Sequence, residues 1–423
     1  MIEYVLKNLI VFLLLALWIA PVSLIAATQN SDFSLVDQHA ALSREVWRIQ
    51  TQKNPSLLKP LSGAQIDEII DGSIQWLTRA QERSGHFKYE YAPYEDIYIQ
   101  DDNIVRQAGA LYALGEIAHR DTKGVYDLKT TMRRSIRYFE SLSEEGEYNG
   151  KKFRCITDGS GNHVCKLGAT SLALAGILGF VEGYPGYERT YQPLISDYVN
   201  FILAMKTETK GFRNLFNTAK TNQSDKESSF SNGEALLALV RYHQSHPDKR
   251  IKAVIDDTFE YLESEVPFDT ALYLWAMAAL KDLHQEDQRE EYFKYVKAYT
   301  DWRIQSVSHL QNTSHNLCAY IEGIISAYSI LASELNEPEL MKYENEIDRW
   351  LSKSSQLQLG TQNKVRYTGE TPSFIKIKDM EQALGGFLTG QSELTQRIDF
   401  TQHCVTSYVQ KLVDIEETVF LKE

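Results

Sequence analysis

Beyond residue 60 the hydrophobic positions recur with helical spacing almost throughout, and the helical runs are of two kinds. One kind is apolar on nearly every face and rich in small residues, as expected for a helix that is buried all round. The other kind carries charged residues on one face, as expected for a helix that faces water. The apolar runs cover 103–118, 167–181, 232–243, 269–283, 316–332 and 396–412. The amphipathic runs cover 64–81, 124–142, 188–206, 250–265, 288–304 and 338–354.

The two kinds of run alternate along the chain, with six of each. An inner ring of six buried helices inside an outer ring of six amphipathic helices lets every apolar face pack on another layer. The competing arrangement, a right-handed solenoid of helix pairs, would show a constant period. The inner runs begin at 103, 167, 232, 269, 316 and 396, and this spacing is too irregular for a solenoid. The pattern therefore predicts an all-α (α/α)6 toroid with short β-hairpin-like turns, formed by residues 62–423.

Three connections between these helices share a short motif in which glycine comes just before phenylalanine. The stretches are "AQERSGHFKYEY", "AMKTETKGFRN" and "MEQALGGFLTG". We expect each to form a short extended turn whose phenylalanine plugs the rim of the helical ring. The role predicted for these phenylalanines is architectural rather than catalytic.

The N-terminal segment predicts export. Lys7 is followed by an unbroken apolar run from Leu9 to about Ala27, an arrangement typical of a secretory signal. The run approaches the ~18–20 residues that cross a bilayer, so an uncleaved anchor that associates with the inner membrane through residues 9–27 is the alternative. We expect residues 1–27 to be a signal peptide or membrane anchor and 28–61 to be a linker or N-terminal helical extension. The remainder is then periplasmic or held at the outer side of the cytoplasmic membrane.

Cysteine usage fits an exported protein. Cys155 and Cys165 flank "ITDGSGNHV", which has Asp-Gly and Gly-Asn turn signals between two short extended runs. A small hairpin there would bring the two sulfurs together, so a disulfide is predicted between them. Cys318 and Cys404 lie on apolar helical runs, and the simplest interpretation is that they are small buried hydrophobic residues.

The net charge and the aromatic content narrow the range of ligands. A formal net charge of -13 and a pI near 5.4 argue against a nucleic-acid-binding protein, which needs a surplus of lysine and arginine. The chain holds 24 tyrosines, 17 phenylalanines and 6 tryptophans. Such side chains serve a large core first, and they also form the stacking walls of sugar-binding clefts.

The alternating helices, the glycine–phenylalanine turns and the phrases "VRQAGALYALGEI", "NGEALLAL" and "RIDFTQH" resemble the six-hairpin toroid superfamily. Its members include glycoside hydrolases, uronate-polymer lyases, unsaturated-glucuronide hydrolases and sugar epimerases. The resemblance covers roughly residues 62–416 and matches no single family. "RIDFTQH" is also similar to an Arg-x-Asp-aromatic…His string near the end of glucuronyl C5-epimerases, although the spacing to the histidine differs. The resemblance implies a carbohydrate substrate, with uronic acids in it, and no cofactor.

Polar residues gather where the inner helices begin. Inner helices of such a ring run parallel, so their N-termini meet at one mouth, where helix dipoles and free N–H groups favour anionic ligands. Four of these residues, Asp102, Asn232, Asp269 and Asn316, stand where a helix N-cap is expected. The full set is Asp101, Asp102, Asn103, Arg106, His163, Lys166, Asn232, Glu234, Asp269, Tyr273, His315, Asn316, Glu322, Arg397, Asp399 and His403.

Two glutamates and two arginines of this set are unusual because the pattern buries them. Glu234 and Glu322 lie within or beside apolar runs, where an unpaired carboxylate would be costly, so we expect each to be paired or to face a pocket. Arg106 and Arg397 are natural partners for these glutamates or for a substrate carboxylate. We predict that Arg106 and Arg397, far apart in sequence, line one cavity.

Two kinds of sugar chemistry fit these residue types. Hydrolysis needs an acid of raised pKa and a second carboxylate across the glycosidic bond. Lyase or epimerase chemistry removes the proton α to a uronate carboxyl, which needs a base and cations that stabilise the developing charge. The candidate catalytic residues are Asp102, Glu234, Glu322, Asp399 and His403. The candidate substrate-binding residues are Asp101, Asn103, Arg106, Lys166, Tyr273, His315 and Arg397.

Two alternatives lie outside this chemistry. A non-catalytic carbohydrate-binding or scaffold protein of envelope polysaccharide assembly would keep an aromatic cleft without a spaced acid–base pair. A zinc-dependent toroid enzyme could use His315 and Cys318, which share one helical face, with His403 and Cys404 on the neighbouring helix. Because adjacent helical residues point about 100° apart, His403 and Cys404 do not easily bind one ion, and no metal is expected.

Overall fold

A computed structural model describes residues 60–118, 126–224, 226–306, 316–360, 364–365, 377–389 and 395–415. The expected signal or anchor at 1–27, the linker up to residue 59 and His315 lie outside the described residues. In the described part of the chain, no single helix is long and apolar enough to cross a membrane. One bent pair, Leu167–Gly183 with Pro185–Ala204, reaches that length and composition only jointly, across a 118° bend.

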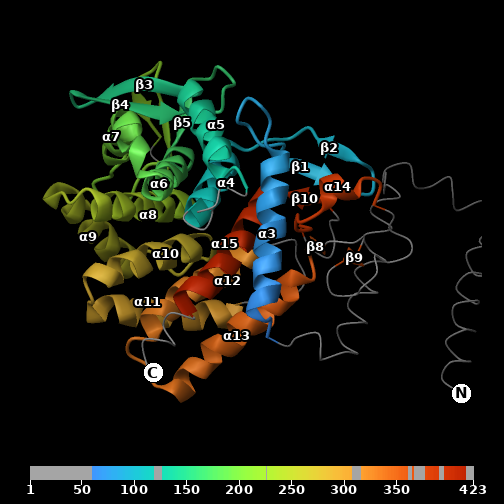
Figure 1. Cartoon of the computed structure of the whole chain (residues 1–423). Coiled ribbons are helices and arrows are strands. Elements are labelled where there is room, and N and C mark those ends of the chain that lie inside the picture. Colours follow the sequence, from blue (N-terminus) through green and yellow to red (C-terminus); the bar gives the residue numbers. More distant parts are fainter. Residues whose placement is uncertain are drawn as a thin grey trace, which may run out of the picture.

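The contacts between the helices of the described residues define an inner and an outer ring, and Figure 1 labels the helices of both. The inner ring comprises α4 (Ile104–Ile117), α6 (Leu167–Gly183), α8 (Ser229–Ser245), α10 (Thr270–Glu286), α12 (Leu317–Leu331) and α15 (Ile398–Gln410). The outer ring comprises α3 (Gly63–Ala80), α5 (Leu128–Ser141), α7 (Glu188–Ala204), α9 (Lys249–Ser264), α11 (Glu290–Gln305) and α13 (Glu337–Ser355). Each inner helix packs on the next, and α15 packs on α4, which closes the ring. The predicted (α/α)6 toroid is confirmed.

Small residues let neighbouring inner helices approach closely. A Cβ atom on Gly176 of α6 would lie 2.7 Å from Cγ of Leu111 on α4, and one on Gly179 would lie 2.9 Å from Cα of Gly115. Since real side chains do not tolerate such contacts, the glycines set the distance between α4 and α6. The small-residue content of the inner runs is therefore a packing requirement.

Short antiparallel sheets cover the ends of the rings. Their strands are β1 (Glu90–Ala92), β2 (Ile97–Ile99), β3 (Ser143–Tyr148), β4 (Lys151–Ile156), β5 (Val164–Lys166), β6 (Leu215–Asn217), β7 (Asn222–Gln223), β8 (Leu359–Gly360), β9 (Lys364–Val365) and β10 (Gln396–Arg397). The strand orders are β10-β1-β2, β3-β4, β5-β6-β7 and β8-β9, and a short helix, α14 (Met380–Ala383), lies near the first of these sheets. The pairing of Glu90 with Arg397 joins the two ends of the toroid and sets Arg397 beside the hairpin that precedes α4.

The three glycine–phenylalanine turns are built alike. Phe87, Phe212 and Phe387 are all buried, and each forms an isolated antiparallel bridge to a residue just after an outer helix, namely Gln81, Lys206 and Gln358. The backbone N–H of each phenylalanine donates to a polar side chain in the first turns of an inner helix. The acceptors are Gln107 Oε1 at 2.9 Å, Asn232 Oδ1 at 2.8 Å and Thr401 Oγ1 at 3.1 Å. This repeated contact fastens each rim turn to the inner ring.

Two of the four expected N-caps are confirmed and two are wrong. Asp269 accepts from the N–H of Ala271 and caps α10, and Asn316 accepts from two N–H groups and caps α12. The cap of α4 is Asn103 rather than Asp102. Asn232 lies inside α8, because the helix begins three residues earlier at Ser229 and the amide serves the rim turn instead.

The predicted disulfide between Cys155 and Cys165 is present, with the two Cα atoms 5.6 Å apart. The hairpin expected between them is reduced to one bridge, Thr157 with Cys165. The flanking strands find other partners, because β4 pairs with β3 and β5 pairs with β6. The disulfide therefore links two different sheets over α6.

Candidate functional site

A cavity of about 670 Å³ opens where the inner helices begin. Its wall includes residues from the first turns of α4, α8, α10, α12 and α15, as expected for parallel inner helices whose N-termini meet. Many of the residues that line the cavity have polar or aromatic side chains. These residues are Asn103, Arg106, Phe230, Glu234, Tyr273, Trp275, Arg303, Tyr320, Arg397, Asp399, Phe400, Gln402 and His403.

Arg106 and Arg397 line this cavity together, as predicted. They are bridged by Asp399, which accepts from Nε of Arg397 at 2.6 Å and from its Nη2 at 2.9 Å, and lies 3.1 Å from Nε of Arg106. Arg106 also donates to the hydroxyl of Tyr89. The expectation that these arginines pair with Glu234 or Glu322 is wrong, because Asp399 lies between them. Two guanidinium groups therefore share the carboxylate of Asp399.

Glu234 is buried in the wall of the cavity at 4% exposure. Its Oε2 has no hydrogen-bond partner among the described residues. Burial raises the pKa of Glu234 from an ordinary 4.5 to about 8. The side chain has room because Gly168 of α6 faces it: a Cβ atom there would lie 2.2 Å from Oε2. The geometry holds a carboxylic acid in its neutral, proton-donating form at neutral pH.

His403 faces the cavity with a buried carboxylate behind it. Its Nδ1 lies 2.8 Å from Oε2 of Glu322, whose side chain is fully buried on α12 and does not line the cavity. Burial raises the pKa of Glu322, and the hydrogen bond with His403 acts in the opposite direction. A carboxylate that accepts from Nδ1–H fixes the imidazole tautomer and leaves Nε2 as the basic nitrogen. Trp275 packs beside the imidazole, with ring centroids 5.8 Å apart.

Besides Glu322, three predicted site residues lie outside the cavity wall, namely Asp101, Asp102 and Lys166. Asp102 was a candidate catalytic residue, but its oxygens take up contacts from His86, the N–H of Asn103 and the amide of Gln107. Asp101 is exposed and accepts from the N–H of Asp102. Lys166 lies 3.9 Å from Asp158 and is directed to the disulfide loop. These side chains organise the approaches to α4 and α6 rather than the cavity.

Two further residues predicted to bind substrate, Asn103 and Tyr273, do line the cavity. Asn103 lines the cavity while its side chain caps α4. Tyr273 lines the cavity as well, although its hydroxyl donates to Oγ1 of Thr300 at 3.1 Å and points toward α11.

The most important residue that the sequence did not single out is Arg303. It comes from the outer helix α11, is 5% exposed, and reaches the cavity wall between α10 and α12. A signal for it existed: Tyr295, Tyr299 and Arg303 recur every four residues on the buried face of an amphipathic run. Phe230 was also missed; it lines the cavity, is 55% exposed and offers a flat face to a ligand.

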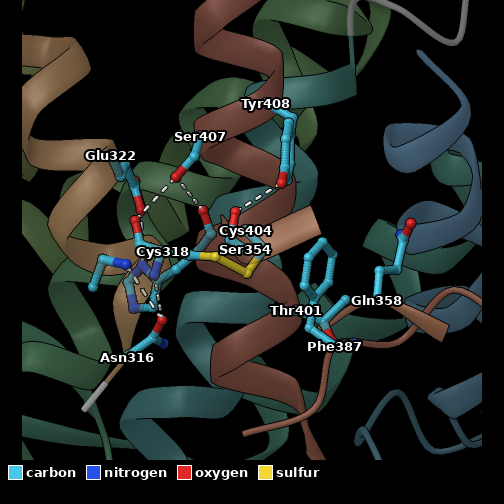
Figure 2. The surroundings of a disulfide bond; sticks show 12 residues. Asn316, Cys318, Glu322, Ser354, Gln358, Phe387, Thr401, Cys404, Ser407 and Tyr408 are labelled. Atoms are coloured by element: carbon cyan, nitrogen blue, oxygen red, sulfur yellow. Dashed lines mark hydrogen bonds and ion pairs between the residues drawn. A yellow bond between two sulfur atoms is a disulfide. The ribbon is translucent and has the colours of Figure 1, made fainter. Parts of the chain in front are cut away.

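Cys318 and Cys404 form a second disulfide, which corrects the expectation of two isolated buried thiols. Their Cα atoms are 4.7 Å apart on the adjacent helices α12 and α15. Figure 2 shows this bond with Glu322 and Ser407 around it, and Ser407 donates to the carbonyl of Cys318 at 3.0 Å. The sequence could not pair them because 86 residues separate them. The bond joins the two helices that carry Glu322 and His403.

The zinc alternative required Cys318 and Cys404 as thiolate ligands. Their sulfurs are bonded to each other, so neither is a thiolate. Within the described ranges, no group of three or more histidine, cysteine, aspartate or glutamate side chains is arranged to hold a metal ion.

Replacing Cys318 and Cys404 together by serine is expected to lower the free energy of unfolding by about 4.5 kcal/mol, since the disulfide closes a long loop. The same change at Cys155 and Cys165 should cost about 2.7 kcal/mol, because that loop is short. Guanidinium unfolding of both double variants measures the difference. Equal losses would contradict a stabilisation that arises from loop closure.

At the opposite end of the inner ring, a buried ion cluster replaces the cavity. Arg241 donates through Nη2 to Glu116 at 3.0 Å and through Nε to Asp282 at 3.0 Å, joining α8 to α4 and α10. Its guanidinium also lies over the ring of Tyr112, 5.1 Å from the centroid. Because Arg241 pairs with both carboxylates, we interpret the cluster as a structural contact that holds α4, α8 and α10 together at this end of the ring.

No family model and no curated protein matches the chain. Among solved structures, a GH76 α-mannanase from Bacteroides thetaiotaomicron has 10% identity and a TM-score of 0.56, covering 85% of this chain and 97% of that one. The chain has the six-hairpin toroid fold. An unsaturated glucuronyl hydrolase specific for heparin matches with 10% identity and a TM-score of 0.55, covering 84% of this chain and 99% of that one. A sugar epimerase from a ruminal bacterium matches with 9% identity and a TM-score of 0.57, covering 84% and 100%.

These similar toroids are all carbohydrate-active by their descriptions, and they share the fold rather than the sequence of this chain. The two disulfides of the six-hairpin toroid described here are typical of an oxidising, extracytoplasmic compartment.

Proposed function

We propose that this six-hairpin toroid is an exported enzyme that acts on a uronic-acid-containing polysaccharide or oligosaccharide by moving the proton α to a uronate carboxyl. The observation that carries the proposal is the meeting of two groups in one cavity: Glu234, a neutral acid, and His403, an imidazole oriented by Glu322. Similar toroids that include a glucuronyl hydrolase and a sugar epimerase support a carbohydrate substrate.

The arginine pair suits a uronate carboxylate. Arg106 and Arg397 approach Asp399 through Nε and, for Arg397, through Nη2, and both line the cavity. Guanidinium groups bind carboxylates through paired hydrogen bonds, and their charge stabilises the enolate-like character that develops when the neighbouring carbon loses a proton. In this role Arg106 and Arg397 bind substrate, and Asp399 positions them.

The proton transfers follow from the other two groups. Nε2 of His403 takes the proton from C5 of the uronate, α to the carboxyl. In a lyase, the electron pair forms the C4–C5 double bond, the C4–O bond breaks, and Glu234 donates its proton to the departing oxygen. In an epimerase, the C4–O bond stays intact and a proton returns to C5 from the opposite face, where Glu234 would be the donor. Both reactions share the first step.

Two-carboxylate hydrolysis is less well supported by the geometry. Glu234 and Asp399 are the two carboxylates that line the cavity among the described residues. Asp399 is already engaged by two arginines, which occupies the oxygens that a nucleophile or general base needs. Asp102 and Glu322, the other carboxylates considered from the sequence, do not line the cavity.

The proposal is tested with the protein produced with its own N-terminal segment. This protein is incubated with a panel of uronic-acid polymers in deuterated water. We expect the C5 proton of the uronate to be lost: an epimerase then returns a deuteron to C5, whereas in a lyase C5 becomes part of the C4–C5 double bond and carries no hydrogen. Absorbance of unsaturated products together with new reducing ends would identify a lyase, and deuterium exchange without either signal would identify an epimerase. Reducing ends alone would mean hydrolysis and would overturn the proton-transfer proposal. Binding without any of the three signals would favour the carbohydrate-binding or scaffold role.

A further inference from the structure

Arg303 has a different setting from the other two arginines of the cavity. Arg106 and Arg397 share Asp399, whereas Arg303 has no carboxylate within ion-pair distance among the described residues. Its Nε is buried without a hydrogen-bond partner there, and Nη1 donates to Oγ of Ser306 at 3.3 Å. A buried charge left in this state is costly unless an anion completes it.

The neighbours of Arg303 are aromatic and do not neutralise it. Its guanidinium lies over the ring of Tyr320, 4.6 Å from the centroid. The hydroxyl of Tyr320 donates to Glu346 at 2.8 Å, and that of Tyr273 donates to Thr300. Both tyrosines line the cavity together with Arg303. Their hydroxyl groups donate to Glu346 and Thr300, so neither ring supplies a negative charge to the guanidinium. A flat, weakly hydrated cation in this setting suits an oxyanion.

Arg303 also occupies a different sector of the ring. It enters between α10 and α12, whereas Arg106 and Arg397 lie where α4 meets α15. We therefore expect one anionic group of a ligand to contact either Arg303 or the Arg106–Arg397 pair, but not both. The cavity offers two separate places for negative charge.

We propose that Arg303 is the receptor of a second anionic group, so that the ligand of this cavity is an oligosaccharide with two negative charges, a uronate carboxylate and a sulfate or second carboxylate. The proposal rests on the function proposed above for the same cavity, whose first anion subsite is the Arg106–Arg397 pair. A sulfate and a carboxylate both present negatively charged oxygens that accept hydrogen bonds from a guanidinium, so the shared chemistry is an oxyanion on a neighbouring sugar.

Two matched pairs of ligands test this by calorimetric binding. One pair is an unsulfated uronate–hexosamine disaccharide and the same disaccharide with one sulfate on the hexosamine; the other is digalacturonate and its monomethyl ester. We expect the wild-type protein to bind the doubly charged member of at least one pair about tenfold or more tightly, as a charge-assisted hydrogen bond provides. The pair that responds identifies sulfate or carboxylate.

In Arg303→Gln this preference should vanish, while affinity for the singly charged member stays within about twofold, a difference below ~0.5 kcal/mol. Arg303→Lys, which retains the charge, should keep part of the preference. Arg289→Gln is the matched control, because Arg289 lies at the start of the same helix α11 and is paired with Asp287 and Asp256 outside the cavity.

Three results would overturn the inference: no preference in the wild type, a preference that survives in Arg303→Gln, or an equal loss for both members of a pair. Calorimetry does not require turnover. An Arg303-dependent preference in a protein that exchanges no proton would therefore refute the proposed function and uphold the second subsite.

Discussion

Glu234→Gln is expected to lower kcat by about 10²–10⁴-fold with little change in KM, since glutamine fills the same space and cannot donate the proton. In the wild type, Glu234 donates only while protonated, so kcat/KM should fall as pH rises through about 8, where its pKa lies. The variant should lose this alkaline limb. Steady-state kinetics across pH on the substrate found in the polymer panel measures both effects.

The matched control is Asp101→Asn, an isosteric change of an exposed carboxylate near the start of α4 that does not line the cavity. It should leave kcat within about twofold, since surface changes away from the chemistry have small effects. If Glu234→Gln keeps a third or more of the wild-type kcat, Glu234 is not the acid.

Glu234 should also leave a signature in stability. Its folded pKa is raised above the unfolded value, so the folded state holds a proton that the unfolded state has released between pH 4.5 and about 8. The free energy of unfolding of the wild type therefore falls across this window, relative to Glu234→Gln, and the difference is constant above it. Urea unfolding of both proteins at pH 5 and pH 8 gives the two differences.

The second large effect is expected at the His403–Glu322 pair. His403→Gln removes the base and should lower kcat by about 10²–10⁴-fold. Glu322→Gln keeps the shape but removes the charge that fixes the imidazole, and should also lower kcat by at least about 10²-fold with KM unchanged. Because the two residues act as one unit, the double variant should be no slower than His403→Gln alone.

A purely structural role for Glu322 would predict a different pattern. A weakened fold would lower the melting temperature, and the loss of kcat would follow the unfolded fraction. If Glu322 positions the imidazole, Glu322→Gln should lower kcat in a protein that keeps its melting temperature, because the amide no longer fixes the tautomer of His403. A folded Glu322→Gln protein that keeps a third or more of the wild-type kcat would refute the positioning role.

The arrangement of helices could be read from the sequence because it depends on burial. An inner helix packed on every side must be apolar all round, and an outer one must not, so the alternation of the two kinds specifies the ring. The glycine–phenylalanine motif likewise marked the rim turns. Its partner side chains, such as Asn232 and Thr401, were not recognised, because a hydrogen bond to a distant backbone N–H leaves no periodic signal.

The candidate site was predictable in outline but not in its pairing. Asp, Asn, Glu and Arg at the helix starts indicated a polar mouth, yet the sequence did not distinguish Asp102, which faces His86 and Gln107, from Asp399, which faces the arginines. A shift of one residue along a helix turns a side chain by about 100°, which is enough to direct it away from the axis of the ring. The same limit applied to Cys318 and Cys404, whose partnership depends on the closure of α12 against α15.

That closure has a consequence for how the protein is made. The wall that carries the arginine pair forms only when α15, the last inner helix, docks on α4, the first. During synthesis, nearly the whole chain must be made before this seam can close, and until then the apolar flanks of both helices are open to other chains. We infer that C-terminal truncation before α15 yields aggregation rather than a smaller working protein.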